Sequence, residues 1–299
     1  MKLHRQIRLL LAGLLTIAFA SSALAQDTAP EFARIAVDDQ DRPAALQMPI
    51  VRYVPFANDR LLEVDLVGAV HIGDPSYYAE LNTRFRDYDA VLFELIAPED
   101  ALAPGRLEKR SGILSTTQVG MMNLLDLSFQ LDEINYDAAN FVHADLSPKE
   151  MRESMEERGE SLYVYFWRIF FASLNEYAKD PLGLKDMEVL SGVLSSGQGD
   201  SLKTMAAYEI TNVKQASDML GSDSGSAVIE ARNQRAIDVL LREIDGGAQR
   251  IGIFYGVAHL PDMEERLLEQ LGLTYESTEW VDAWQLGQQD DDEYLDNKE

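Results

Sequence analysis

The chain has 299 residues, with 26 Lys and Arg against 51 Asp and Glu, which gives a formal net charge of −25. This acidity argues against a nucleic-acid-binding protein and against docking on anionic lipid, because both depend on clustered basic side chains. The absence of Cys excludes disulfides, thiolate metal ligands and a Cys nucleophile. A hydrophobic share of 46% is ordinary for a globular protein.

Residues 1–25 have the pattern of a secretory signal peptide. Three basic residues precede an apolar stretch over 9–20, and the triplet Ala23-Leu24-Ala25 forms a cleavage site before Gln26. Since the apolar stretch is shorter than the ~20 residues of a membrane span, we expect cleavage rather than anchoring. The sequence therefore predicts a periplasmic or secreted protein without a stable membrane span. Its net charge would be −28, because the leader carries three positive charges and no negative ones.

The first predicted unit of regular structure is a strand, a helix and a second strand. Residues 26–45 are expected to form an irregular N-terminal arm. The apolar run 61–67 predicts a strand, Asp74-Pro75 begins a helix over 76–86, and 90–96 predicts another buried strand. This spacing is typical of a βαβ unit with parallel strands.

The remaining elements follow the same reasoning. A loop and then a helix are expected over 98–128, and an aromatic-rich helix over 162–174, either buried or covering a substrate groove. Ser147-Pro148 predicts the start of a helix, because Glu150 completes a capping box. The other expected elements are strands over 141–145, 250–255 and 273–286, and helices within 185–223, over 228–244 and over 261–271.

These elements predict an α/β fold, close to the α+β boundary, with a mixed central sheet built from two related βαβ-containing halves. We expect a single domain over 26–288, with a helical insertion at about 100–225. Residues 289–299 are strongly acidic and are expected to form a disordered tail.

Two Gly-x-x-His motifs, each following an apolar strand, suggest the chemistry. Gly68 precedes His71, and Gly256 precedes His259. Each histidine is expected at the C-terminal edge of the sheet, where open α/β sheets bind ligands. Outside the predicted leader the chain has three histidines, and two of them occupy these matching positions. A hydrogen-bonded structural histidine is the alternative for either one, but the repetition favours a shared site.

Glu94 lies within the second predicted strand and should emerge at the same edge as His71. An ionised carboxylate there requires a partner, either a metal or a buried Arg. Two imidazoles and a carboxylate suit Zn, Mn, Fe or Co, and a metal-bound water would be a nucleophile near neutral pH.

Four further residues are candidates for supporting roles. Arg232 and Asn233 lie on the helix before the second motif, and Arg232 could stabilise an oxyanion. Its alternative is a surface salt bridge with Glu230 or Asp238. His143 and Asp145, also at a strand end, form a supplementary pair, for which a structural role is favoured.

The paired motifs, the strand-end Glu and the Arg-Asn helix resemble the TraB/PrgY family, which includes GumN-like bacterial proteins and the TIKI proteases. The wider superfamily includes erythromycin-esterase-like and haem-binding ChaN-like proteins. The resemblance covers residues 61–286, with a divergent central segment. TIKI proteases use Mn or Co, which implies an active site of His71, Glu94 and His259, with Arg232 as the matching arginine.

The sequence therefore predicts an exported metal-dependent hydrolase that uses Mn, Co or Zn and acts on a peptide or protein. Glu94 and Arg232 would be catalytic, and His71, Glu94 and His259 would hold the metal. One alternative is a non-catalytic binding protein that sequesters a peptide, a metal or haem. The other is a metal-free esterase with a His general base, as the erythromycin-esterase resemblance allows.

Overall fold

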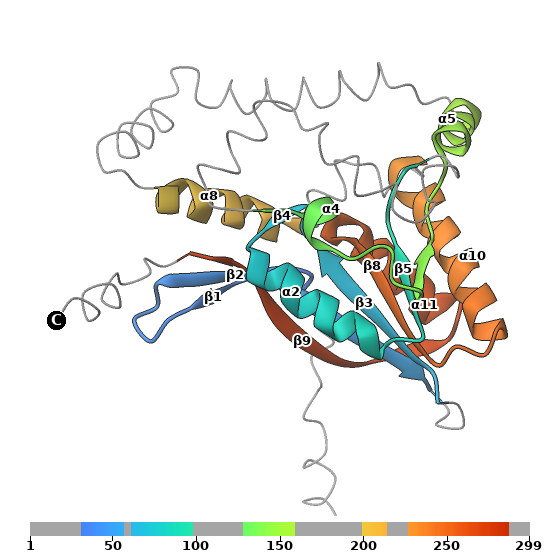
Figure 1. Cartoon of the computed structure of the whole chain (residues 1–299), viewed down its shortest axis with the longest axis horizontal. Helices are drawn as coiled ribbons and strands as arrows, with labels where there is room; N and C mark the ends of the chain where they lie inside the picture. The colour runs from blue at the N-terminus through green and yellow to red at the C-terminus, as the bar shows by residue number, and fades with distance from the viewer. Residues whose placement is uncertain (1–30, 57–60, 98–127, 159–198, 214–226, 287–299) are drawn as a thin grey trace, which may run out of the picture. The chain divides into compact units, whose positions relative to one another are not determined.

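The computed structural model describes residues 31–56, 61–97, 128–158, 199–213 and 227–286 (Figure 1). The predicted signal peptide, the aromatic helix over 162–174 and the acidic tail lie outside these ranges. Within them, no helix is long and apolar enough to cross a membrane.

Seven strands of the described residues form one mixed sheet, which confirms the predicted fold class. The sheet order is β9-β2-β3-β8-β5-β7, and β1 pairs with the part of β2 that β3 leaves open. β2 runs antiparallel to its partners, whereas β3, β8, β5 and β7 are mutually parallel. The bounds are β1 Arg34–Val37, β2 Pro43–Pro55, β3 Glu63–Ala69, β5 Ala90–Phe93, β7 Phe141–His143, β8 Arg250–Gly256 and β9 Leu273–Gln285.

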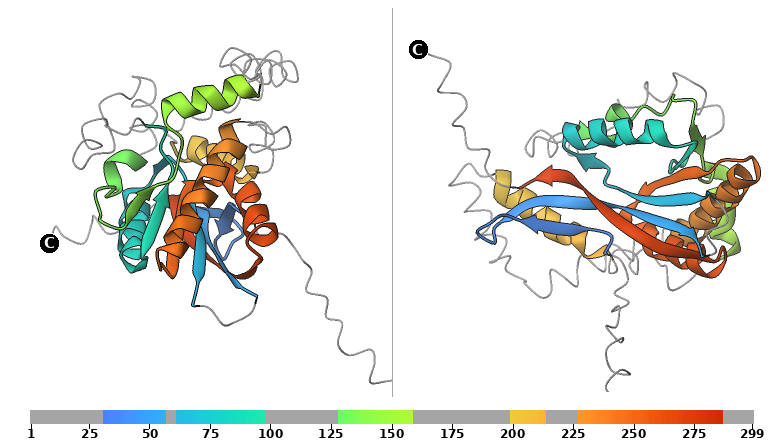
Figure 2. Two further views of the ribbon diagram at one scale, coloured as in Figure 1. Left: turned by 90° about the vertical axis from the view of Figure 1, so that its right-hand side faces the viewer. Right: turned by 90° about the horizontal axis from the view of Figure 1, so that it is seen from below.

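Helices cover both faces of this sheet (Figures 1 and 2). Phe254 of β8 packs against Phe85 beside α2, whereas the next residue, Tyr255, packs against His259 before α11. Because successive side chains of a strand point to opposite faces, α2 and α11 lie on opposite sides. The helices are α2 Pro75–Arg84, α4 Gln130–Glu133, α5 Pro148–Glu157, α8 Gly199–Thr211, α10 Arg232–Asp245 and α11 Leu260–Glu269; η1 spans Phe85–Asp87, η5 Ala227–Ala231 and η6 Val257–His259.

The two predicted helix starts use their polar residues differently. Ser147 and Glu150 form the predicted capping box at α5. Asp74 occupies the N-cap of α2, but its carboxylate makes no capping bond. Instead it accepts hydrogen bonds from Lys203 Nζ at 2.9 Å and from the backbone N–H of Gln285 at 2.6 Å. Asp74 therefore joins α2 to α8 and β9.

The irregular arm expected over 26–45 is wrong, because this segment contains β1 and the start of β2. Asp38 closes the intervening turn by accepting the backbone N–H groups of Gln40 and Arg42. β2 then pairs over Ala45–Pro55 with β9, which lies 218 to 240 residues later in the chain. Pairing with β9 stabilises β2, whose apolar and polar residues alternate too weakly to predict a strand from its own sequence.

The two strands of the first βαβ unit run in the predicted direction, but they are not adjacent in the sheet. β3 and β5 run parallel, as expected, yet β8 is inserted between them. β5 also ends at Phe93 rather than at residue 96, so Glu94 lies one residue beyond the strand. The insertion near 100–225 contributes β7 to the main sheet in addition to its helices.

Candidate functional site

Four parallel strands end at one edge of the sheet and bring the predicted residues there. Ala69, the last residue of β3, pairs with Gly256, the last of β8. His71 follows β3 by two residues, Glu94 follows β5 by one, and Asp145 follows β7 by two. Parallel strands share their C-terminal edge, which is the usual ligand-binding edge of such sheets.

The predicted metal ligands surround a small space beside Gly256. A Cβ atom at Gly256 would lie 3.2 Å from Glu94 Oε2, 3.9 Å from His71 Nε2 and 4.0 Å from His259 Cδ2. The backbone N–H of Gly256 donates to Glu94 Oε2 at 2.7 Å. Glycine at this position therefore leaves open the space on which the two imidazoles and the carboxylate converge.

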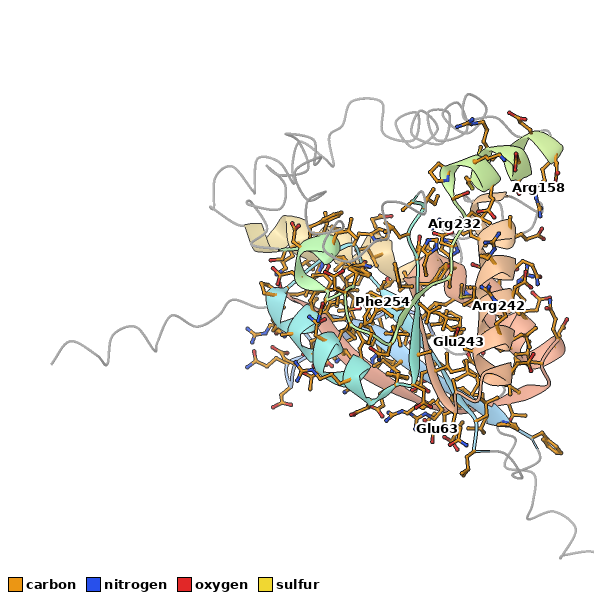
Figure 3. All side chains as sticks on the ribbon, turned by 45° about the vertical axis from the view of Figure 1, so that its right-hand side comes forward. Glu63, Arg158, Arg232, Arg242, Glu243 and Phe254 are labelled. Carbon is orange, nitrogen blue, oxygen red and sulfur yellow. The ribbon has the colours of Figure 1, made fainter. Side chains whose placement is uncertain are left out.

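Arg232 is the buried cation of the site. It lies at one end of the sheet, whereas Glu63 lies at the other end (Figure 3). Its Nε and Nη2 donate to the two carboxylate oxygens of Asp145 at 2.9 and 2.6 Å. Nη2 also donates to Glu94 Oε1 at 2.6 Å. The structure thus contains the buried Arg partner that was one alternative for Glu94.

The surface salt bridge considered for Arg232 is wrong. Glu230 pairs instead with Arg158, and Asp238 accepts a hydrogen bond from Gln234. Burial opposes the charge of Arg232, but its hydrogen bonds to Asp145 and the negative charges of Glu94 and Asp145 raise the pKa of Arg232 above its usual value.

Glu94 is held in its ionised form. Burial alone would raise its pKa, but the charges of His259, Arg232 and His71 and the Gly256 N–H together lower the pKa of Glu94 to about 2. Where His259 is neutral, Arg232 supplies the compensating charge. Because such a low pKa makes Glu94 a weak proton acceptor, its chemistry is that of an anionic ligand or an electrostatic partner.

His259 is 4% exposed, and burial lowers its pKa to about 4, although the Glu94 charge opposes this shift. Its Nδ1 lies 2.6 Å from Asn233 Oδ1, while Asn233 Nδ2 donates to the His259 carbonyl at 3.0 Å. An amide oxygen accepts only from a protonated Nδ1, so Nε2 carries the lone pair. Arg232 Nη1 lies 3.4 Å from that Nε2. The sequence-predicted Asn233 thus orients His259.

His71 is oriented in the same manner by residues that sequence reasoning missed. Its Nδ1 lies 3.1 Å from Oε1 of Gln130, whose Nε2 donates to the Tyr136 hydroxyl at 2.7 Å. No sequence signal distinguishes Gln130 from a surface glutamine, because its contact with His71 spans 59 residues.

The two remaining predicted residues lie outside this cluster. His143 Nε2 donates to the Leu95 carbonyl at 2.7 Å, which supports the structural role favoured for it. A Cβ at Gly68 would lie 2.8 Å from Pro49 Cδ. Gly68 therefore permits close packing of β3 and contributes no group to the site.

The side chains are of types that bind divalent cations, but the described residues contain no group of three or more His, Asp or Glu side chains placed to hold a metal ion. Both Glu94 oxygens already accept hydrogen bonds, from Arg232 and Gly256. Even so, the carboxylates of Glu94 and Asp145 outnumber the Arg232 cation by one charge. Imidazole nitrogens and a carboxylate are ligand types that Zn and Mn take, but the Nε2 of His259 faces Arg232 Nη1 at 3.4 Å in this arrangement.

No protein-family model matches the chain, and no curated protein sequence matches it either. The resemblance to the TraB/PrgY family therefore stays a prediction from the motifs.

The lowered pKa of His259 predicts acid sensitivity of the metal-free protein. An unfolded histidine takes up a proton near pH 6.5, whereas folded His259 does so only near pH 4. Stability present above pH 6.5 is therefore lost as the pH falls towards 4, by roughly 3 kcal/mol. Below about pH 4.5, protonation of Glu94 in the unfolded chain continues the loss.

Urea unfolding in chelator at pH 7, 6, 5 and 4 measures this effect. The variant His259→Gln should show a shallower decline of unfolding free energy than wild type. A His143→Gln chain keeps His259 and should retain the steep decline. Equal slopes for wild type and His259→Gln would contradict the prediction.

Proposed function

We propose that this protein is a metal-dependent hydrolase that acts on peptide bonds, with its active site beside Gly256. The observation that carries the proposal is the convergence of His71 Nε2, Glu94 Oε2 and the His259 ring on one small space. Both histidines have Nδ1 against a side-chain amide oxygen, the arrangement that orients metal-binding imidazoles with the lone pair on Nε2, although Nε2 of His259 also lies 3.4 Å from Arg232 Nη1.

Each residue has a distinct role in this proposal. His71 and His259 would hold the cation through Nε2, and Glu94 through a carboxylate oxygen. A bound divalent cation would lower the pKa of a water and polarise the scissile carbonyl. Arg232 keeps Glu94 ionised and oriented, and Asp145 fixes the Arg232 guanidinium through two hydrogen bonds. Arg232 would stabilise developing oxyanion charge through Nη1, which lies 3.4 Å from His259 Nε2 in the structure.

A metal-free hydrolase is the second candidate, and one observation favours it. Arg232 already neutralises Glu94 at 2.6 Å, so the cluster is partly compensated without a metal. In this mechanism the Nε2 of His71 would accept the proton of the attacking water, and Arg232 would stabilise the oxyanion.

Metal binding tests the first candidate directly. We expect the full chain to bind Zn, Mn or Co stoichiometrically in titration calorimetry, and His71→Ala and His259→Ala to weaken binding at least tenfold. His143→Ala is the matched control, because it removes the one remaining histidine outside the predicted leader and should bind as wild type does. Equal binding by all three variants would contradict a metal site at this edge.

Hydrolysis of a fluorescence-quenched peptide library separates the candidates. Activity that chelator abolishes and one of these metals restores supports the metal-dependent hydrolase. Activity that resists chelator but requires His71 supports the metal-free mechanism. Stoichiometric metal binding without turnover of any peptide indicates a binding protein instead.

A further inference from the structure

We propose that Gln130, itself held by Tyr136, sets the tautomer of His71, so that its Nε2 lone pair faces the space beside Gly256. This inference rests on the proposed function for the role of His71 and adds two positioning residues to it. Neither residue touches the space itself; both act through the imidazole.

Gln130 contacts His71 at two points. Its backbone N–H donates to the His71 carbonyl at 2.9 Å, and its Oε1 lies 3.1 Å from His71 Nδ1. The short strands β4 (Ile72–Gly73) and β6 (Ser128–Phe129) pair immediately beside these contacts. Gln130 is 4% exposed, so its amide is shielded from water and its hydrogen bonds must be met within the protein.

Tyr136 contacts the nitrogen end of the Gln130 amide. Gln130 Nε2 donates to the Tyr136 hydroxyl at 2.7 Å, which leaves Oε1 directed at the imidazole. The Tyr136 ring is fixed by packing against Phe93, with ring centres 5.1 Å apart, and against Phe141 at 5.7 Å. An oxygen at this position accepts from a protonated Nδ1 and selects that tautomer.

The three histidines of the described residues provide an internal comparison. His259 faces the Asn233 amide oxygen through Nδ1, so it should share the tautomer of His71. His143 donates from Nε2 to the Leu95 carbonyl and should have the opposite tautomer. Two tautomers are therefore expected in one protein, and the site histidines share the form with the lone pair on Nε2.

Long-range ¹H–¹⁵N correlation spectra of the full chain, labelled with ¹⁵N-histidine, in chelator at pH 8, test this directly. Each signal is assigned from its own His→Asn variant. We expect the proton on Nδ1 for His71 and His259, and on Nε2 for His143. Gln130→Leu should shift His71 towards the Nε2-protonated form, and Gln130→Glu should preserve the wild-type form because its carboxylate still accepts. Tyr136→Phe should give a mixture, since the amide can then rotate.

Gln249→Leu is the matched control, because Gln249 is exposed before β8, at the other end of the sheet. It should leave the His71 signals unchanged. In the library assay, Gln130→Leu should lower kcat about 10- to 100-fold with little change in KM, and Gln130→Glu should recover most of this loss.

A wild-type His71 with its proton on Nε2, or a Gln130→Leu chain with an unchanged His71 tautomer, would overturn the inference. If Gln130→Leu does not fold, the wild-type, Gln130→Glu and Tyr136→Phe spectra decide it. The predicted tautomers in a protein that neither binds metal nor hydrolyses peptides would support the positioning role and reject the proposed function alone.

Discussion

Replacement of Arg232 by Met is expected to destabilise the protein by about 3–5 kcal/mol, because it leaves two buried carboxylates without their counter-ion. Asp145 is fully buried and loses both side-chain hydrogen bonds from the guanidinium. Among the described residues, Glu94 then keeps the Gly256 N–H as its one close hydrogen-bond donor. The midpoint of urea unfolding, with its slope, measures the change.

Arg235→Met is the matched control for this variant. Arg235 lies one turn away on α10 and pairs with Glu150, but both side chains are more than a third exposed. Such surface pairs contribute ~1 kcal/mol or less, so the control should unfold almost as wild type does. A double variant, Arg232→Met with Asp145→Asn, should recover part of the lost stability, because one of the unpaired charges is removed. Equal stability of Arg232→Met and Arg235→Met would show that the buried network does not stabilise the fold.

Replacement of Gly256 by Ala is expected to lower peptide hydrolysis and metal affinity about 10- to 100-fold while leaving the fold intact. The backbone at Gly256, with φ −53° and ψ 137°, suits any residue. Its new methyl group would lie 3.2 Å from Glu94 Oε2 and would occupy the space between the imidazoles. Unfolding free energy should change by less than about 1 kcal/mol, as is usual for a Gly→Ala change without backbone strain.

Gly252→Ala tests whether this effect is local. Gly252 lies four residues earlier in β8, and a Cβ there would also meet a side chain closely, at 3.3 Å from Tyr88 Cε1. This control should alter stability modestly and leave metal binding and hydrolysis unchanged. If Gly256→Ala binds metal and cleaves peptides as wild type does, the space beside Gly256 is not the site.

Much of the fold could be predicted where short-range patterns suffice. The apolar runs of β3, β5 and β8 and the capping box of α5 are local signals, and the structure contains each of them. The hairpin of β1 and β2 was not predicted, because β2 is stabilised by β9 at the far end of the chain. Strand pairing at such separations leaves little trace in the sequence of either strand.

The candidate site was likewise predicted in part. Two Gly-x-x-His motifs, a Glu after an apolar strand and an Arg-Asn pair indicated the candidate site residues, because strand ends and unusual buried charges can be recognised in the sequence. The sequence did not show how these residues are arranged in space. Insertion of β8 between β3 and β5 aligns the two motifs, and it decides that Arg232 lies between Asp145 and Glu94.

The candidate residues could be recognised in the sequence, because two histidines of an acidic, cysteine-free chain occupy matching strand-end motifs. How their side chains are held depends on the fold. The tertiary structure places Gln130 against His71, Asn233 against His259 and the Arg232 guanidinium beside Glu94. The physical reason is that hydrogen-bond direction and charge compensation depend on partners distant in the chain, whereas strand and helix formation depends largely on neighbours.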